Sequence, residues 1–217
     1  MSAAHPPTAH RPSSMKPSKI VCVGRNSREH AKELGNEVPP EPLLFLKPPS
    51  SLIANGQPIV LPPQSKQVEH EGEIGVVVGR QLRNASTDEA RDAIQSIIAL
   101  NDVTARDLQR KDSQWTRAKG FDTFCPIGEP AKGPVDLAGL TVVTRVNGVE
   151  RQRGYGSDMV FAIPDLLAYI STVMTLEPGD LVATGTPAGV GTLVSGDEVE
   201  VEVVGLSRVR NPVTVGA

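Results

Sequence analysis

The 217-residue sequence is poor in aromatic residues and in cysteine. Only 3% of its residues are Phe, Trp or Tyr, whereas 39% are hydrophobic. A chain of this length can bury a sizeable core, which must therefore consist mainly of Val, Ile, Leu and Ala. The two cysteines, Cys22 and Cys125, are too few for a disulfide framework and indicate a reducing compartment.

The sequence also lacks a long apolar run and an excess of basic charge. The formal net charge is −3, and the isoelectric point is near 5.8. A transmembrane helix needs about 20 consecutive apolar residues, and proteins that bind nucleic acid or anionic membranes usually present a basic surface. We therefore expect neither a nucleic acid nor a membrane among the partners.

The first 19 residues contain no Asp or Glu but include four prolines and two histidines. This composition predicts a disordered N-terminal tail over 1–18, followed by a single folded domain over 19–217. The tail has no apolar segment of the secretory type, and its prolines oppose the amphipathic helix of a transit peptide. We expect a cytoplasmic protein, with the mitochondrial matrix as the alternative if the source is eukaryotic.

Nucleotide-binding signatures are missing as well. The sequence GTPAGVG at 185–191 is a glycine-rich loop, and such loops expose backbone N–H groups that can bind anions. No Walker lysine follows it, and it does not match GxGxxG. The loop therefore does not predict a nucleotide site.

The stretch 67–79 organises the sequence. It joins acidic residues at alternate positions to a β-branched apolar run that ends at Gly79, which predicts a strand. Side chains alternate between the two faces of a strand, so the acidic residues share one face and the apolar residues the other. The acidic face carries Glu69, Glu71 and Glu73, and the apolar face carries Ile74, Val76 and Val78.

Two interpretations of these carboxylates remain open on spacing alone. The simpler one is a solvated acidic edge strand. The other is a site for a hard divalent cation, because neighbouring carboxylates repel one another and burying them is costly without a cation. Spacing does not select two of the three glutamates. Asp102, which ends an apolar run, is either a third ligand or only the acidic end of a strand.

A short helix is predicted over 27–36, with Ser27 at its N-cap and Gly35 near its end. Residues three apart share a helical face, so His30 and Glu33 can meet. A carboxylate beside an imidazole orients it and raises its basicity, as a general base requires. On spacing alone, a solvated surface pair is the favoured interpretation.

The remaining pattern predicts an α+β protein rich in strands. Further helical segments are expected at 88–95 after a capping box at Ser86, at 104–109, and at 163–174. The segment 111–120 reads as a loop. The Asn147-Gly148 pair predicts a tight hairpin. Strands are expected at 19–24, 43–47, 58–62, 96–103, 140–146, 149–153, 181–184 and 198–204.

Several segments, in this order, resemble the fumarylacetoacetate hydrolase family, in its short single-domain branch of acylpyruvate hydrolases. The His30–Glu33 pair is one of them. The others are IVCVGRN at 20–26, LFLKP at 44–48, HEGE at 70–73, DVTARD at 102–107, AKGFD at 118–122 and TGTPAGVG at 184–191. The resemblance implies a mixed β-sheet roll with a few peripheral helices and a homodimeric assembly.

The resemblance also implies roles for ten residues. It selects Glu71, Glu73 and Asp102 as ligands of Mg²⁺ or Mn²⁺ and leaves Glu69 out. It makes His30 and Glu33 a water-activating pair on a lid, and it places Lys119 beside the reacting oxygen. The α-keto carboxylate of the substrate is expected on Arg25, Arg106, Gln109 and Thr186. In one departure, Ser27 stands where the family commonly has Tyr, which affects lid packing and substrate preference.

The expected reaction is hydrolysis of an acylpyruvate to pyruvate and a carboxylic acid. The small-molecule substrate is an α-keto acid whose enolate the metal stabilises. The alternatives use the same metal site: decarboxylation of oxaloacetate, or isomerisation or tautomerisation of a 2-hydroxy-dienoate or of oxaloacetate. A non-enzymatic, metal-stabilised structural protein would not need His30, Glu33 and Lys119.

Overall fold

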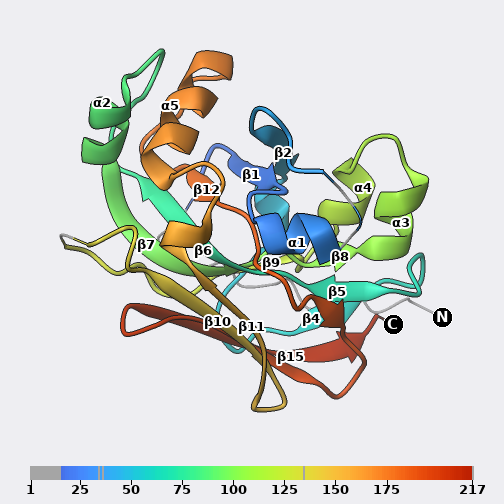
Figure 1. Cartoon of the computed structure of the whole chain (residues 1–217). Coiled ribbons are helices and arrows are strands. Elements are labelled where there is room, and N and C mark those ends of the chain that lie inside the picture. Colours follow the sequence, from blue (N-terminus) through green and yellow to red (C-terminus); the bar gives the residue numbers. More distant parts are fainter. Residues whose placement is uncertain (1–15, 34, 36, 134, 217) are drawn as a thin grey trace.

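Two five-stranded sheets form the framework of the computed structural model, which describes residues 16–33, 35, 37–133 and 135–216 (Figure 1). The central sheet is mixed: β1 is parallel to β12, and the other neighbours are antiparallel. Its strands, in spatial order, are β2 (Leu43–Lys47), β1 (Ile20–Gly24), β12 (Leu181–Ala183), β6 (Gly72–Val78) and β7 (Ile94–Asn101).

The second sheet lies below the central sheet in Figure 1. Its order is β11 (Val149–Tyr155), β10 (Thr141–Val146), β14 (Glu198–Val203), β15 (Ser207–Val215) and β4 (Ile59–Leu61). Smaller ladders join β13 (Gly191–Thr192), β5 (Val68–His70) and β8 (Thr104–Ala105), and β3 (Leu52–Ile53) with β9 (Cys125–Pro126).

Short helices lie around the sheets. They are α1 (Arg28–Glu33), α2 (Thr87–Asp92), α3 (Arg106–Lys111), α4 (Thr116–Lys119) and α5 (Ile163–Val173), with 3₁₀ turns at Pro49–Ser51 and Gly156–Asp158. In Figure 1, α2 and α5 lie together at one end of the molecule, and α3 and α4 form a separate pair. Among the described helices, none is long and apolar enough to cross a membrane.

Aliphatic side chains fill the core, as the low aromatic content predicts. Ile74, Val76 and Val78 of β6 share one buried cluster with residues of the second sheet and of α5. On the other face of the central sheet, Val77 packs with Ile98 and Leu181. The predicted alternation along 74–78 is therefore confirmed, and the expected mixed-sheet α+β fold is present.

Three local predictions need correction. The stretch 67–79 is not one strand. It forms two strands, β5 and β6, which are separated by Glu71 and belong to different sheets. The supposed loop 111–120 contains the four-residue helix α4, which is too short to show an apolar period. Strand β15 was not predicted, because two of its buried residues, Ser207 and Asn211, are polar and break the alternation of polar and apolar side chains.

The hairpin and the capping box are confirmed. Asn147 and Gly148 both have positive φ, 52° and 77°, as a tight turn between β10 and β11 requires. Ser86 and Glu89 exchange their hydrogen bonds at the start of α2. Of the predicted tail 1–18, positions 1–15 lie outside the described residues. Ser18 is described, and its backbone N–H and hydroxyl both donate to Asp180.

Candidate active site

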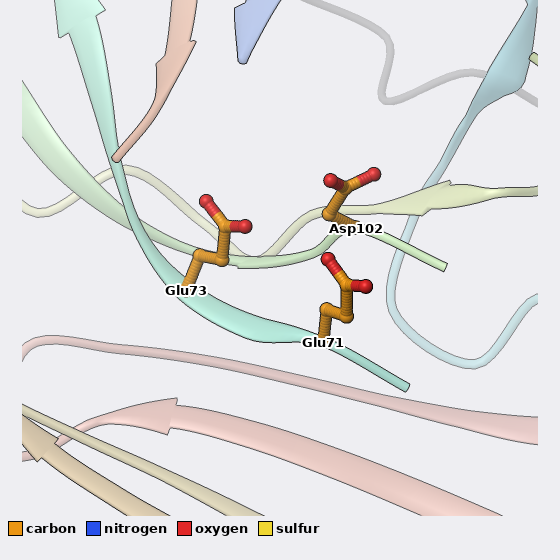
Figure 2. A group of neighbouring side chains, drawn as sticks. All are labelled: Glu71, Glu73 and Asp102. Carbon is orange, nitrogen blue, oxygen red and sulfur yellow. The ribbon is translucent and has the colours of Figure 1, made fainter. Parts of the chain in front are cut away.

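Three buried carboxylates converge where β6 and β7 run side by side (Figure 2). Glu71 lies in the break between β5 and β6, Glu73 lies in β6, and Asp102 directly follows β7. The antiparallel pairing of β6 with β7 places them together, and Asp102 N donates to Glu71 O over 2.8 Å. One ligand oxygen from each residue lies within 4.8 Å of the other two.

Two of these carboxylates are held by buried cations. Lys119 Nζ donates to Glu71 Oε2 over 2.8 Å and to Asp102 Oδ2 over 2.6 Å. Lys47 Nζ donates to the other Asp102 oxygen over 2.7 Å. The Arg106 guanidinium contacts Glu71 and also Glu69, from which its Nε lies 2.8 Å away. Glu69 is thus a partner of Arg106 and does not belong to the triad.

The cluster has one carboxylate more than it has buried cations, so it carries an excess negative charge when all four carboxylates are ionised. It contains four buried carboxylates, Glu69, Glu71, Glu73 and Asp102, but three buried cations, Lys47, Arg106 and Lys119. Among the described residues, Glu73 has no cationic partner; it accepts a hydrogen bond from Gly185 N over 2.7 Å. A divalent cation beside Glu73 would supply the missing positive charge.

The pKa values follow from this uneven compensation. Burial and the neighbouring charges of Asp102 and Glu71 raise the pKa of Glu73 well above its ordinary value. Burial acts in the same direction on Glu71, but Lys119 and Arg106 outweigh it and hold the pKa of Glu71 below its ordinary range. For Lys119, the carboxylates of Asp102 and Glu71 outweigh burial and raise its pKa to about 12, so it is an ammonium ion at neutral pH.

The donor set fits Mg²⁺ or Mn²⁺. All three side chains offer carboxylate oxygens, the hard ligands that these ions prefer. The side chains of Glu71, Glu73 and Asp102 point to the same side, as Figure 2 shows. Because these side chains are buried, they do not form the solvated acidic edge that spacing also allowed.

A cavity of about 480 Å³ opens beside the triad. Phe45 and Trp115 form its apolar wall, with ring centroids 5.3 Å apart. All ten residues named from the sequence line it, although they come from elements far apart in the chain. They are Arg25, His30, Glu33, Glu71, Glu73, Asp102, Arg106, Gln109, Lys119 and Thr186.

Helix α1 brings the histidine and its carboxylate to the cavity. His30 Nδ1 lies 3.1 Å from Glu33 Oε2, and the His30 side chain is buried. The other Glu33 oxygen accepts a hydrogen bond from Gly189 N over 3.0 Å, which links α1 to the glycine-rich loop. The buried imidazole faces the same cavity as the triad, whereas Glu33 is exposed, so the histidine is not part of the fully solvated surface pair that spacing also allowed.

The substrate-binding candidates differ in how many contacts their side chains already make within the protein. Arg25 lies at the end of β1 with a φ of 60°, an uncommon backbone conformation for a residue other than Gly. Arg106 is already engaged: besides its two glutamates, its Nη1 contacts Gln109 Oε1 over 2.5 Å. Thr186 Oγ1 donates to Gly72 O over 3.0 Å. Arg106 therefore also serves as a counter-ion of the acidic cluster.

Sequence reasoning gave no role to two buried residues of the site. Lys47 was part of the segment 44–48, but nothing in its spacing paired it with Asp102. Gln152 is on β11 in the second sheet, and its side chain contacts His70, Gly72 and Thr186. An isolated Gln in a polar strand has no signature, so only the tertiary structure identifies it.

Comparison with known proteins shows relationships over most of the chain. A mitochondrial oxaloacetate decarboxylase of Dictyostelium discoideum is 44% identical, with 87% of this chain and 89% of that protein covered. The mitochondrial oxaloacetate tautomerase FAHD1 of Arabidopsis thaliana is 44% identical, with 89% of each chain covered.

Solved structures agree with this relationship. A protein from Mycobacterium smegmatis described as 5-carboxymethyl-2-hydroxymuconate delta-isomerase superposes with a TM-score of 0.87. It is 42% identical, and the match covers 94% of this chain and 81% of that one. The model of the fumarylacetoacetate (FAA) hydrolase C-terminal domain matches residues 19–214. The chain therefore belongs to the fumarylacetoacetate hydrolase family, as its sequence motifs predict.

Proposed function

We propose that this protein is a divalent-metal-dependent enzyme that acts on oxaloacetate, by decarboxylation or by keto–enol tautomerisation. The observation that carries the proposal is the meeting of three elements in one cavity: the Glu71–Glu73–Asp102 triad, Lys119, and the His30–Glu33 pair. The names of the two eukaryotic relatives support oxaloacetate as the substrate better than an acylpyruvate.

Mg²⁺ or Mn²⁺ on Glu71, Glu73 and Asp102 would act as a Lewis acid toward the 2-oxo group and its enolate. The ammonium group of Lys119 lies against two of these carboxylates. From there it can donate a hydrogen bond to the substrate oxygen that becomes negative as the enolate forms. The partial neutralisation of Glu71 and Asp102 by lysine also keeps the cluster from being too negative for an anionic substrate.

His30 is the candidate for proton transfer at carbon. In tautomerisation, one proton moves between the enol and C3, and in decarboxylation C3 takes up a proton after CO₂ has left. Glu33 accepts from the imidazole and orients it, as a general acid–base residue requires. Arg25, Gln109 and Thr186 would hold the substrate carboxylates, because each lines the cavity and offers a donor.

Hydrolysis of acylpyruvates is the second candidate. It is favoured by the His30–Glu33 pair, which could deprotonate a water molecule instead of a carbon acid. The isomerase named for the M. smegmatis structure represents another use of the same proton transfer. In all four reactions the enolate is the shared intermediate, so the residues that would stabilise it, such as Lys119, keep the same role, whereas the proton that His30 moves differs.

A substrate panel with Mg²⁺ tests the proposal. Purified protein is given oxaloacetate, its enol, and acetylpyruvate, and pyruvate formation and enol absorbance are followed. We expect kcat/KM to be higher for an oxaloacetate reaction than for acetylpyruvate. If acetylpyruvate is cleaved efficiently while neither oxaloacetate reaction exceeds the rate without enzyme, the second candidate replaces the first.

Cellular location needs its own experiment. A cytoplasmic location is the expectation from the sequence, whereas the two eukaryotic relatives are named as mitochondrial. Fractionation of the source cells, with detection of the protein by antibody, decides between the two.

A further inference from the structure

Gln152 connects the strands that carry the metal-site carboxylates to the glycine-rich loop. It comes from β11, and only 1% of its surface is exposed. Its carbonyl oxygen Oε1 lies 3.0 Å from Gly72 N and 3.1 Å from His70 Nδ1. Its nitrogen Nε2 lies 2.8 Å from both Thr186 Oγ1 and Pro187 O. The amide thus uses all four of its hydrogen-bonding positions, although it does not line the cavity.

The orientation of this amide is fixed by its neighbours. The backbone N–H of Gly72 can only donate, so the atom that faces it must be the oxygen. The carbonyl of Pro187 can only accept, so the atom that faces it must be the nitrogen. Nε2 therefore donates to the Thr186 hydroxyl.

This bond determines what Thr186 can offer to a ligand. A hydroxyl has one hydrogen and two acceptor positions. One acceptor position is taken by Gln152, and the hydrogen points to Gly72 O over 3.0 Å. Because Gln152 has no acceptor atom facing the hydroxyl, Gln152 does not compete for this hydrogen, and an anionic oxygen in the cavity would compete for it with Gly72 O.

We propose that Gln152 is a positioning residue that acts through Thr186, keeping its hydroxyl a hydrogen-bond donor toward the carboxylate of a 2-oxo acid. This rests on the proposed function, because it assumes that an anionic oxygen binds beside Thr186. It assigns a role in substrate affinity to a residue of the second sheet that touches neither the cavity nor the metal ligands' side chains.

A double-mutant cycle tests the proposal. Gln152→Glu keeps the shape and the acceptor facing Gly72 but replaces the donor with a carboxylate oxygen, which takes the Thr186 hydrogen. Thr186→Val removes the hydroxyl and keeps the volume. Calorimetry measures the dissociation constant of oxalate, a stable stand-in for the 2-oxo acid head group, in the Mg²⁺-loaded wild type, both single variants and the double variant.

We expect Gln152→Glu to weaken oxalate binding about 10–100-fold in the wild-type background, the value of a hydrogen bond to a charged group. In the Thr186→Val background, the same change should cost less than about threefold, because the group through which it acts is gone. In turnover, the loss should appear mainly in KM. A remote isosteric control, Gln57→Glu, should bind oxalate as the wild type does.

Equal losses in the two backgrounds would overturn the proposal, since a general distortion of the fold does not depend on the Thr186 hydroxyl. Failure of the wild type to bind oxalate would overturn it too. If Gln152→Glu does not fold, Gln152→Met, which removes the donor without adding charge, replaces it in the same cycle. Because oxalate binding does not depend on turnover, an enzyme inactive on oxaloacetate would refute the proposed function and leave this test in force.

Discussion

Lys47 and Asp102, 55 positions apart in the sequence, form an ion pair of 2.7 Å in which both side chains are closed to solvent. Lys47 also donates to Val103 O over 3.1 Å. The pair holds Asp102 Oδ1, while Lys119 holds Oδ2. Each oxygen of this metal-ligand candidate is thus fixed by a different lysine.

Breaking this pair from one side should destabilise the protein. Lys47→Met leaves a buried carboxylate with one cation fewer, which typically costs about 3–5 kcal/mol. Adding Asp102→Asn should recover part of that loss, because the neutral amide needs no cation. Urea unfolding of the metal-free proteins gives the free energies. Lys19→Met, which breaks the partly exposed pair with Asp180, is the matched control and should cost less; strict additivity of the first two changes would contradict the argument.

We expect Glu73 to lower the stability of the metal-free protein and to be required for metal binding. Its carboxylate has no cationic partner among the described residues, so Glu73→Gln should make the metal-free protein at least as stable as the wild type. The variant should also lose the rise in melting temperature that Mg²⁺ or Mn²⁺ gives the wild type. Chelation should abolish activity and either ion should restore it.

Glu69 supplies the comparison for that experiment. It pairs with Arg106 outside the triad, so Glu69→Gln should lower stability and keep the metal-induced shift. An equal loss of the shift in both variants would mean that the ligand set is wrong, and full activity of chelated protein would refute the metal requirement.

His30 should matter unequally to the candidate reactions. General acid–base catalysis contributes about 10²–10⁴-fold, so His30→Ala should reduce tautomerisation of oxaloacetate and hydrolysis of acetylpyruvate by roughly that factor. Decarboxylation should fall less, because loss of CO₂ needs no base. The measurement is kcat/KM for each substrate in both proteins. Equal losses in all three would show that His30 has a general role, such as ordering α1.

We expect Asp180 to make the stability of the protein depend on pH in the acid range. Burial alone would raise its pKa, but hydrogen bonds from Lys19, Glu177 N and Ser18 outweigh this effect and lower the pKa below its ordinary value. A group with a lowered folded-state pKa stabilises the protein above about pH 4 and loses that contribution as the pH falls through its folded-state value. Asp180→Asn should therefore cost about 1–3 kcal/mol at pH 7 and much less near pH 2, as urea unfolding at the two pH values will show. An equal cost at both would contradict this assignment.

The homodimer implied by the family remains a prediction. Leu46, on the edge strand β2, is 46% exposed and is a candidate contact. Light scattering should give twice the chain mass of 23.0 kDa, and Leu46→Glu should shift the mass toward the monomer. A monomer mass for the wild type at working concentration would refute the dimer.

The sequence predicted the elements with a strong local pattern. The period-two apolar run at 74–78, the capping box at Ser86 and the Asn147-Gly148 turn are determined by nearby residues, so they could be predicted without the fold. The ten site residues followed from their resemblance to a family, not from spacing, and the structure places all ten around one cavity. Their individual roles stay predictions.

Long-range partners could not be predicted. The break at Glu71 depends on β5 and β6 joining different sheets, and the choice of Arg106 as the partner of Glu69 depends on how α3 packs. Lys47 and Gln152 gain their roles from contacts across 55 and 34 positions, respectively. The periodicity of the sequence contains no information about such long-range contacts.

The position of β12 between β1 and β6 has a consequence during synthesis on the ribosome. Gly185, just after β12, donates to Glu73 from 112 positions further along the chain. At 5–20 residues per second, the ribosome adds that length in about 6 to 22 seconds. During that time β6 cannot yet pair with its neighbour β12. The loop that contacts Glu73 therefore cannot reach the carboxylate triad until most of the chain has been synthesised.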